Sequence, residues 1–145
     1  EHARVRYPEI AFRQHGPALA MAFGDPNALS EGLGNLLDNA GRHAAAAVDV
    51  TIVPQLGRTE IVVRDDGAGV PAGQEESIFE RVLTIGTHGG AGLGLAIARE
   101  LMERDGGGVD LRDGAFHIWL PSSHRRRRMA GTARSERSRV GAERA

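Results

Sequence analysis

A chain of 145 residues with a hydrophobic content of 41% is long enough for one domain with a buried core. The absence of cysteine excludes disulfides, thiolate metal sites and a cysteine nucleophile. All 18 basic residues are arginine, which excludes a Walker-type phosphate loop and the catalytic lysine of Ser/Thr/Tyr protein kinases.

The formal net charge of −1 conceals two regions of opposite charge. Residues 1–124 contain 17 Asp and Glu against 10 Arg, and this acidic balance argues against binding of nucleic acid. Residues 125–145 contain 8 Arg, 2 Glu and almost no large apolar side chain, which predicts disorder. We therefore expect one domain over residues 1–121 and an Arg-rich tail over residues 122–145.

No stretch of the chain approaches the roughly 20 consecutive apolar residues that a membrane-spanning helix needs. The chain also opens without a signal peptide, so we expect no membrane contact by this segment. Its first residue is Glu rather than Met, which indicates a piece of a longer protein.

Periodicity and turn residues predict the secondary structure in chain order. Residues 3–13 and 18–23 are expected to be extended and joined as a hairpin. Asp25 before Pro26 predicts the start of a helix that continues to about residue 43. The later elements are strands over 48–53 and 60–64, a short helix over 74–82, a helix that opens at Gly92, and a closing hairpin over 109–112 and 115–120. This order predicts an α+β fold, a two-layer α/β sandwich with a mixed sheet of about five strands, a flanking hairpin and three main helices.

The predicted helix over residues 26–43 carries several polar side chains on one stripe. Asn35 and Asn39 are one turn apart, with Glu31 a turn before them and Arg42 about a turn after. Amide oxygens are neutral, hard ligands that suit a Mg²⁺ ion which also binds triphosphate oxygens. We therefore predict that Asn35 and Asn39 bind Mg²⁺ together with a nucleotide, the alternative being a plain polar stripe.

A glycine-rich loop, Asp65-Asp-Gly67-Ala-Gly69, follows the second predicted strand pair. A carboxylate here can accept a hydrogen bond from the exocyclic amine of a base, and the glycines let backbone approach the ring closely. In isolation, a tight turn is the simpler interpretation.

A second glycine-rich segment, Gly90-Ala-Gly92-Leu-Gly94, opens the last predicted helix. Free amides at such a helix start can face phosphate oxygens. It is not the dinucleotide fingerprint, because Leu95 occupies the position of its last glycine.

In this order, the motifs closely resemble those of the catalytic and ATP-binding domain of sensor histidine kinases. That family belongs to the superfamily that includes gyrase, the mismatch-repair ATPase and the heat-shock chaperone ATPase. The resemblance covers about residues 1–121 and implies the Bergerat-type ATP-binding fold. The segments that carry it are Asn35-Leu-Leu-Asp-Asn39-Ala with Arg42-His43, Asp65-Asp-Gly67-Ala-Gly69-Val-Pro, Ile78-Phe79-Glu80-Arg81, and Gly90-Ala-Gly92-Leu-Gly94-Leu-Ala-Ile.

The resemblance implies a role for each matching residue. Asn35 and Asn39 would bind Mg²⁺ and phosphate oxygens, and Asn35 would act in catalysis with Glu31, which would orient the attacking group or a metal-bound water. Asp65 would bind the adenine amine, and residues 83–91 would form a lid over the nucleotide. The other residues expected to bind nucleotide are Arg42, His43, Gly67, Gly69, Val70, Gly90, Gly92, Leu93 and Gly94. Ile78 and Leu95 are expected to line the adenine slot together with Val70.

The resemblance implies an ATP-dependent protein-histidine kinase of a bacterial two-component system, located in the cytoplasm or forming the cytoplasmic part of a membrane-bound sensor. The γ-phosphate would pass to a histidine on a dimerisation domain, and a response regulator would act downstream. No segment resembles the acceptor pattern His-Glu-x-x-x-Pro, so we expect the acceptor elsewhere in a longer sensor or on a separate chain. Two alternatives remain: an anti-sigma-type serine kinase, and a nucleotide-binding interaction module without transfer activity.

Overall fold

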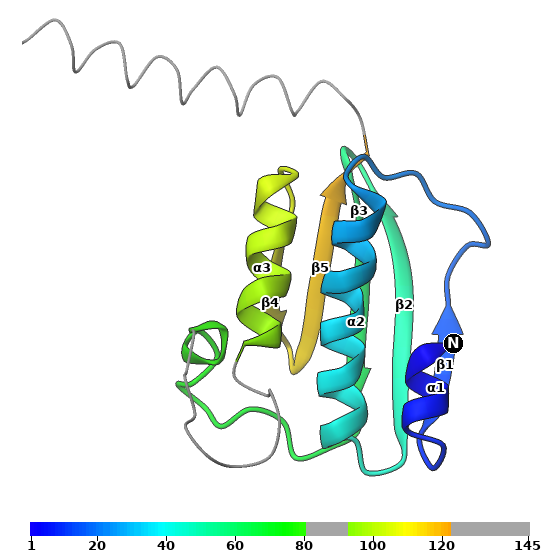
Figure 1. Ribbon diagram of the computed structural model, residues 1–145, viewed down its shortest axis with the longest axis vertical. Helices are drawn as coiled ribbons and strands as arrows, with labels where there is room; N and C mark the ends of the chain where they lie inside the picture. Colours follow the sequence, from blue (N-terminus) through cyan, green and yellow to red (C-terminus); the bar gives the residue numbers. More distant parts are fainter. Residues whose placement is uncertain (81–92, 123–145) are drawn as a thin grey trace, which may run out of the picture.

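The computed structural model describes residues 1–80 and 93–122, which form a sheet with helices packed on one of its faces (Figure 1). Helices α2 and α3 lie side by side across the sheet, and α1 lies beside the edge strand β1 (Figure 1). The elements in chain order are α1 (His2–Arg6), β1 (Ala11–His15), α2 (Pro26–His43), β2 (Ala47–Gln55), β3 (Arg58–Asp65), the 3₁₀ helix η1 (Ser77–Phe79), α3 (Gly94–Arg104), β4 (Gly108–Arg112) and β5 (Ala115–Pro121).

The sheet has five strands in the order β1-β2-β3-β5-β4. Strand β1 pairs with β2 in parallel, because α2 forms the crossover between them, and the other three pairings are antiparallel. The two-layer sandwich with a mixed sheet is therefore confirmed. In the described part of the chain, no helix is both long and apolar enough to cross a membrane.

The predicted hairpin between residues 3–13 and 18–23 is wrong. Residues 2–6 form helix α1, only Ala11–His15 form a strand, and that strand pairs with β2. The chain leaves β1 at Gly16, whose φ of +104° and close approach to the Ile52 carbonyl both require glycine. Residues 18–23 then run to the far end of the sheet, where Thr59 Oγ1 donates to the Met21 carbonyl. The chain does turn at Gly16 as predicted, but β1 pairs with the distant strand β2 and not with residues 18–23.

Helix α2 begins and ends as its sequence predicts. The Asn27 amide donates to Asp25 Oδ1 over 2.8 Å, and Pro26 occupies the first turn. The Asp25 amide donates to Asp105 Oδ2 over 2.6 Å, so the end of α3 holds the start of α2. These two bonds hold the N-terminal end of α2, which is the end opposite His43 (Figure 1).

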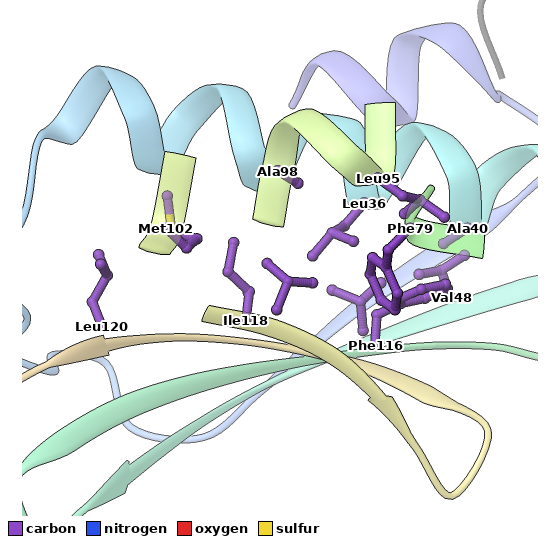
Figure 2. Packing of buried hydrophobic residues seen from close by; sticks show 12 residues of the cluster. Leu36, Ala40, Val48, Phe79, Leu95, Ala98, Met102, Phe116, Ile118 and Leu120 are labelled. Atoms are coloured by element: carbon purple, nitrogen blue, oxygen red, sulfur yellow. The ribbon is translucent and has the colours of Figure 1, made fainter. Parts of the chain in front are cut away.

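Figure 2 shows the core between the helices and the sheet. Leu36 of α2 and Met102 of α3 are fully buried, and they pack above Val48 and Ile118 of the sheet. The two helices approach closely at Gly32 and Ala98, because a Cβ at residue 32 would lie 3.7 Å from Ala98 Cα. The remaining members of this core are Val63, Phe79, Leu95, Val109, Phe116 and Leu120.

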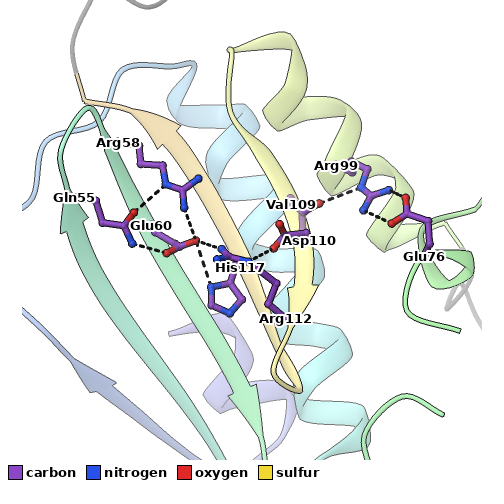
Figure 3. A network of polar contacts seen from close by, with 9 residues as sticks. All are labelled: Gln55, Arg58, Glu60, Glu76, Arg99, Val109, Asp110, Arg112 and His117. Atoms are coloured by element: carbon purple, nitrogen blue, oxygen red, sulfur yellow. Dashed lines mark hydrogen bonds and ion pairs between the residues drawn. The ribbon is translucent and has the colours of Figure 1, made fainter. Parts of the chain in front are cut away.

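The opposite face of the sheet carries a polar network (Figure 3). Side chains alternate along β3, so Glu60 points away from the core face that Val63 covers. Glu60 is only 3% exposed, and its carboxylate receives hydrogen bonds from Arg112 and from Gln55 Nε2. Arg58 adds an ion-pair contact to the same carboxylate, and His117 Nδ1 lies 3.3 Å from it. The buried charge on this face is therefore compensated by several partners.

The later predicted elements are largely confirmed. The closing hairpin forms around Asp113 and Gly114, with φ values of 51° and 70° that suit a tight hairpin turn. The short helix predicted over residues 74–82 is reduced to η1 in the part that the structure describes. The predicted opening of the last helix at Gly92 lies outside the described residues, and α3 begins at Gly94.

Candidate nucleotide-binding site

A cavity of about 280 Å³ lies where α2 ends and the loop after β3 begins. Its walls come from five places: the last turns of α2, the loop after β3, η1, the first turn of α3 and the closing hairpin. The residues that line it are Asn39, His43, Asp65, Ala68, Gly69, Val70, Pro71, Ile78, Leu95, Leu111, Gly114 and Phe116. It therefore joins two of the predicted motifs, the asparagine helix and the first glycine-rich loop, in one site.

The Asp65 carboxylate lies in this cavity with one oxygen engaged. The Gly67 amide donates to Asp65 Oδ1 over 2.9 Å, and Oδ2 has no hydrogen-bond partner within residues 1–80 and 93–122. A Cβ at residue 67 would overlap the His43 carbonyl oxygen, so only glycine fits there. Gly69 has a φ of +75°, which also favours glycine. The loop thus fixes the carboxylate and leaves one oxygen free to accept a hydrogen bond.

The neighbouring Asp66 holds the segment that follows α2. Its Oδ1 accepts from the amides of Ala45 and Ala46 over 2.8 and 3.0 Å, and its own amide donates to the Ala47 carbonyl. These backbone hydrogen bonds, that of Ala46 first, lower the pKa of Asp66 below its ordinary value. Sequence reasoning assigned Asp66 no role. The signal was an Asp beside a glycine turn, which is too common to single out.

The structure divides the polar stripe of α2 between two places. Asn39 and His43, both predicted to bind nucleotide, line the cavity. Asn35 lies next to the start of α3, where a Cβ at Gly94 would be 3.5 Å from Asn35 Cβ. Glu31 and Asn35 line a different groove, between α1 and α2. The two residues predicted to be catalytic therefore do not line the cavity, and Asn35 is the one that lies beside the start of α3.

Arg42, predicted to approach the phosphates, points to another partner. Its guanidinium donates to Asp38 Oδ2 over 2.6 Å. Asp38 Oδ1 accepts from the Tyr7 hydroxyl over 2.8 Å and lies 3.0 Å from Arg6. The Tyr7 ring packs on Gly41, where a Cβ would overlap the ring. Burial, followed by the Asp38 contact, raises the pKa of Tyr7. Asp38 thus joins α1 to the last turns of α2.

The apolar wall of the cavity includes the three predicted residues, Val70, Ile78 and Leu95. It also includes Leu111 and Phe116 of the closing hairpin, which sequence reasoning missed because no local pattern connects that hairpin with the glycine loop. The Phe116 ring meets Phe79 edge to face, with centroids 6.0 Å apart. The wall is therefore an extension of the domain core.

Arg99 of α3 holds η1 against that helix. Its guanidinium lies 3.7 Å from the Phe79 ring centroid and binds the Glu76 carboxylate (Figure 3). The Arg99 contact lowers the pKa of Glu76. Because η1 carries Ile78, this pair helps to place one side of the cavity.

The second glycine-rich segment is only partly described. Leu93 precedes the first residue of α3, Gly94, which faces Asn35. Gly90, Gly92 and the predicted lid over residues 83–91 lie outside the described residues, as does the Arg-rich tail from residue 123. Roles for these residues remain predictions.

The donor set suits a metal ion that arrives with phosphate. Within residues 1–80 and 93–122, no three acidic or histidine side chains gather as a metal site. The side-chain amides of Asn35 and Asn39 have no hydrogen-bond partner in that part of the chain, so their side-chain oxygens are available as neutral ligands. A cation held by such ligands needs negative charge from the nucleotide.

Comparisons with known proteins identify the family of this chain. The family described as Histidine kinase-, DNA gyrase B-, and HSP90-like ATPase matches residues 24–135. Sensor protein kinase CarS of Pseudomonas aeruginosa is 37% identical over 109 residues, which cover 68% of this chain and 24% of CarS. The solved ATP binding domain of PrrB from Mycobacterium tuberculosis is 27% identical, has a TM-score of 0.66, and is matched over 84% of this chain and 87% of that domain. Full-length ShkA, solved in complex with AMPPNP, is 27% identical, with a TM-score of 0.66 over 83% of this chain and 28% of ShkA.

The family match includes Asn39, Asp65 and every other described residue that lines the cavity. The chain spans about a quarter of the length of CarS, while it covers most of the PrrB domain. The likeness is therefore to one domain of these proteins, the one named for ATP binding in PrrB. The chain belongs to the histidine kinase-, DNA gyrase B- and HSP90-like ATPase family, and its relatives place it among the ATP-binding catalytic domains of two-component sensor histidine kinases.

Proposed function

We propose that this domain binds ATP with Mg²⁺ and transfers the γ-phosphate to a histidine on a separate dimerisation domain or chain. The observation that carries the proposal is the fixed Asp65 carboxylate, with one oxygen free, set in a cavity whose other walls are largely apolar. A purine ring needs both features, a flat apolar slot and an acceptor for its exocyclic amine. The AMPPNP complex of full-length ShkA, a relative, supports an adenine nucleotide.

The phosphate chain would extend from this cavity towards Asn35 and the start of α3. Asn39 borders the cavity, and Asn35 lies beside Gly94 just beyond it, so the amides mark a path out of the base slot. Free backbone amides at the first turn of α3 suit phosphate oxygens. Mg²⁺, held by Asn35 and Asn39, would neutralise the developing charge on the phosphates.

In the proposed reaction, a ring nitrogen of the acceptor histidine attacks the γ-phosphorus and forms a phosphorus–nitrogen bond. The bond between the γ-phosphorus and its bridging oxygen breaks, and ADP leaves with the electron pair. Glu31, which lines the groove beside Asn35, would orient the imidazole and accept its proton. The protein contributes mainly position and charge, as in other phosphoryl transfers.

The proposal is tested with the chain, radiolabelled ATP·Mg²⁺ and a purified dimerisation-domain fragment that carries an acceptor histidine. We expect label on the fragment that is labile to acid and stable to base. Glu31→Gln should bind ATP normally and transfer at least about tenfold more slowly. The exposed residue Glu103 of α3 provides the control, and Glu103→Gln should transfer at the wild-type rate.

Other outcomes would support the alternatives. Acid-stable label on a serine of a partner protein would indicate an anti-sigma-type serine kinase. Tight ATP binding without any transfer would indicate an interaction module. Absence of ATP binding would contradict the proposal at its first step.

A further inference from the structure

We propose that Asp66 is a positioning residue for recognition of the nucleotide base, a role that rests on the proposed binding of ATP in the cavity. Asp66 does not line the cavity, and its side chain is exposed. It joins the two segments that supply the polar groups of the cavity, namely the end of α2 and the loop after β3 (Figure 1).

The Asp66 carboxylate forms a clamp on the connection that follows α2. One carboxylate oxygen of Asp66 accepts from two successive amides, those of Ala45 and Ala46, at 2.8 and 3.0 Å. Within the described ranges, these two amides have no other hydrogen-bond partner. The Asp66 amide donates to the Ala47 carbonyl, so side chain and backbone both grip the same short connection.

The chain is tightly packed at Gly67, immediately after this clamp. At residue 67 the backbone approaches the His43 carbonyl so closely that a Cβ would overlap it. The same Gly67 amide binds Asp65 Oδ1. Gly67, the residue immediately after Asp66, therefore contacts both Asp65 and His43. A shift of the clamp would move the base-reading carboxylate relative to the end of α2.

Loss of the Asp66 carboxylate should affect the position of Asp65 more than the stability of the fold. Because the Asp66 side chain is exposed, its removal opens no cavity in the core, and water can replace it as acceptor for Ala45 and Ala46. The fold should persist while the connection gains freedom. Asp105 is a matched control, because its carboxylate accepts the Asp25 amide in the same way at the opposite end of α2.

The test measures affinity of the full chain for ATP and GTP by isothermal titration, together with the melting temperature. We expect wild type to prefer ATP. In Asp66→Ala, the ratio of GTP to ATP dissociation constants should fall about tenfold through misplacement of Asp65. Asp66→Asn keeps an oxygen that can accept both amides and should retain most of the preference. Asp105→Ala should lower the melting temperature by about as much as Asp66→Ala does. It should leave the ratio of GTP to ATP dissociation constants unchanged.

Several results would overturn the inference. A wild-type ratio of GTP to ATP dissociation constants in Asp66→Ala would do so. The same holds if Asp105→Ala or Asp66→Asn loses as much preference for ATP as Asp66→Ala. Should Asp66→Ala fail to fold, Asp66→Glu replaces it, because a carboxylate displaced by one methylene should also lose preference. A wild-type chain that binds neither nucleotide would contradict the proposed function itself, whereas tight ATP binding with an unaffected Asp66→Ala ratio would overturn this inference alone.

Discussion

Arg42 and Asp38 form an ion pair one turn apart on α2, with Arg42 Nη2 2.6 Å from Asp38 Oδ2. Both side chains are largely covered, at 33% and 24% exposure, because α1 lies over them through Tyr7 and Arg6. This ion pair holds the Arg42 guanidinium away from the cavity. Attachment of α1 and availability of Arg42 are therefore linked through one carboxylate.

This link predicts that Asp38→Ala strengthens ATP binding. The variant frees Arg42 for phosphate, and an ion pair of this kind contributes up to about 1 kcal/mol, which corresponds to roughly fivefold in affinity. Arg42→Ala should abolish the gain in the double variant. Titration of both variants with ATP·Mg²⁺ checks this. Unchanged or weaker binding in Asp38→Ala would show that Arg42 does not reach the nucleotide.

The metal prediction concerns Asn39, whose amide borders the cavity. Asn39→Ala should remove one Mg²⁺ ligand and lower Mg²⁺-dependent ATP affinity by at least about tenfold. Asn27→Ala, in the first turn of the same helix, serves as a control and should bind normally. Titration with and without Mg²⁺ separates metal binding from base binding, and equal affinity of wild type and Asn39→Ala would refute the metal assignment.

Asp65→Asn tests recognition of the base. The substitution keeps the size of the side chain but replaces the charged acceptor with a neutral one, which should weaken ATP binding by about tenfold. GTP should remain a poor ligand. Competition between the two nucleotides on the same protein measures the effect, and equal affinity for ATP and GTP in wild type would argue against this role of Asp65.

The lowered pKa of Asp66 predicts a loss of stability in acid. Its folded-state pKa lies below the ordinary value of 3.8, so the carboxylate stabilises the fold above that value. This contribution is lost as the pH falls through the folded-state pKa, because protonation then removes the bonded charged form. Urea unfolding at several pH values should show a steeper acid decline for wild type than for Asp66→Asn. Parallel curves would contradict the assignment.

Leu36 tests the core that supports the cavity. It is fully buried between α2, α3 and the sheet, so Leu36→Ala should lower the free energy of unfolding by about 2–5 kcal/mol. Leu56, at the tip of the turn between β2 and β3, is fully exposed. Leu56→Ala should stay within about 0.5 kcal/mol of wild type, and urea denaturation compares the two. A small effect at Leu36 would contradict the packing shown in Figure 2.

Local patterns predicted those features whose physical cause is local. Asp25 caps α2 as expected because an N-cap bond joins residues two positions apart. The closing hairpin forms at Asp113-Gly114 because its turn tolerates positive φ. Val70, Ile78 and Leu95, for which the family resemblance implied an adenine slot, line the cavity. The ordered motifs were enough to identify the family that the comparisons confirm.

The sequence by itself therefore determined the helix that carries Asn35 and Asn39, the glycine turn after Asp65, and the ATPase family. Only the tertiary structure decided the parallel partner of β1, the contribution of Phe116 to the cavity, the capture of Arg42 by Asp38 and the clamp made by Asp66. Pairings between distant segments depend on which surfaces the packed core brings together. Turns, caps and helical faces depend on neighbouring residues, and these are already adjacent in the chain.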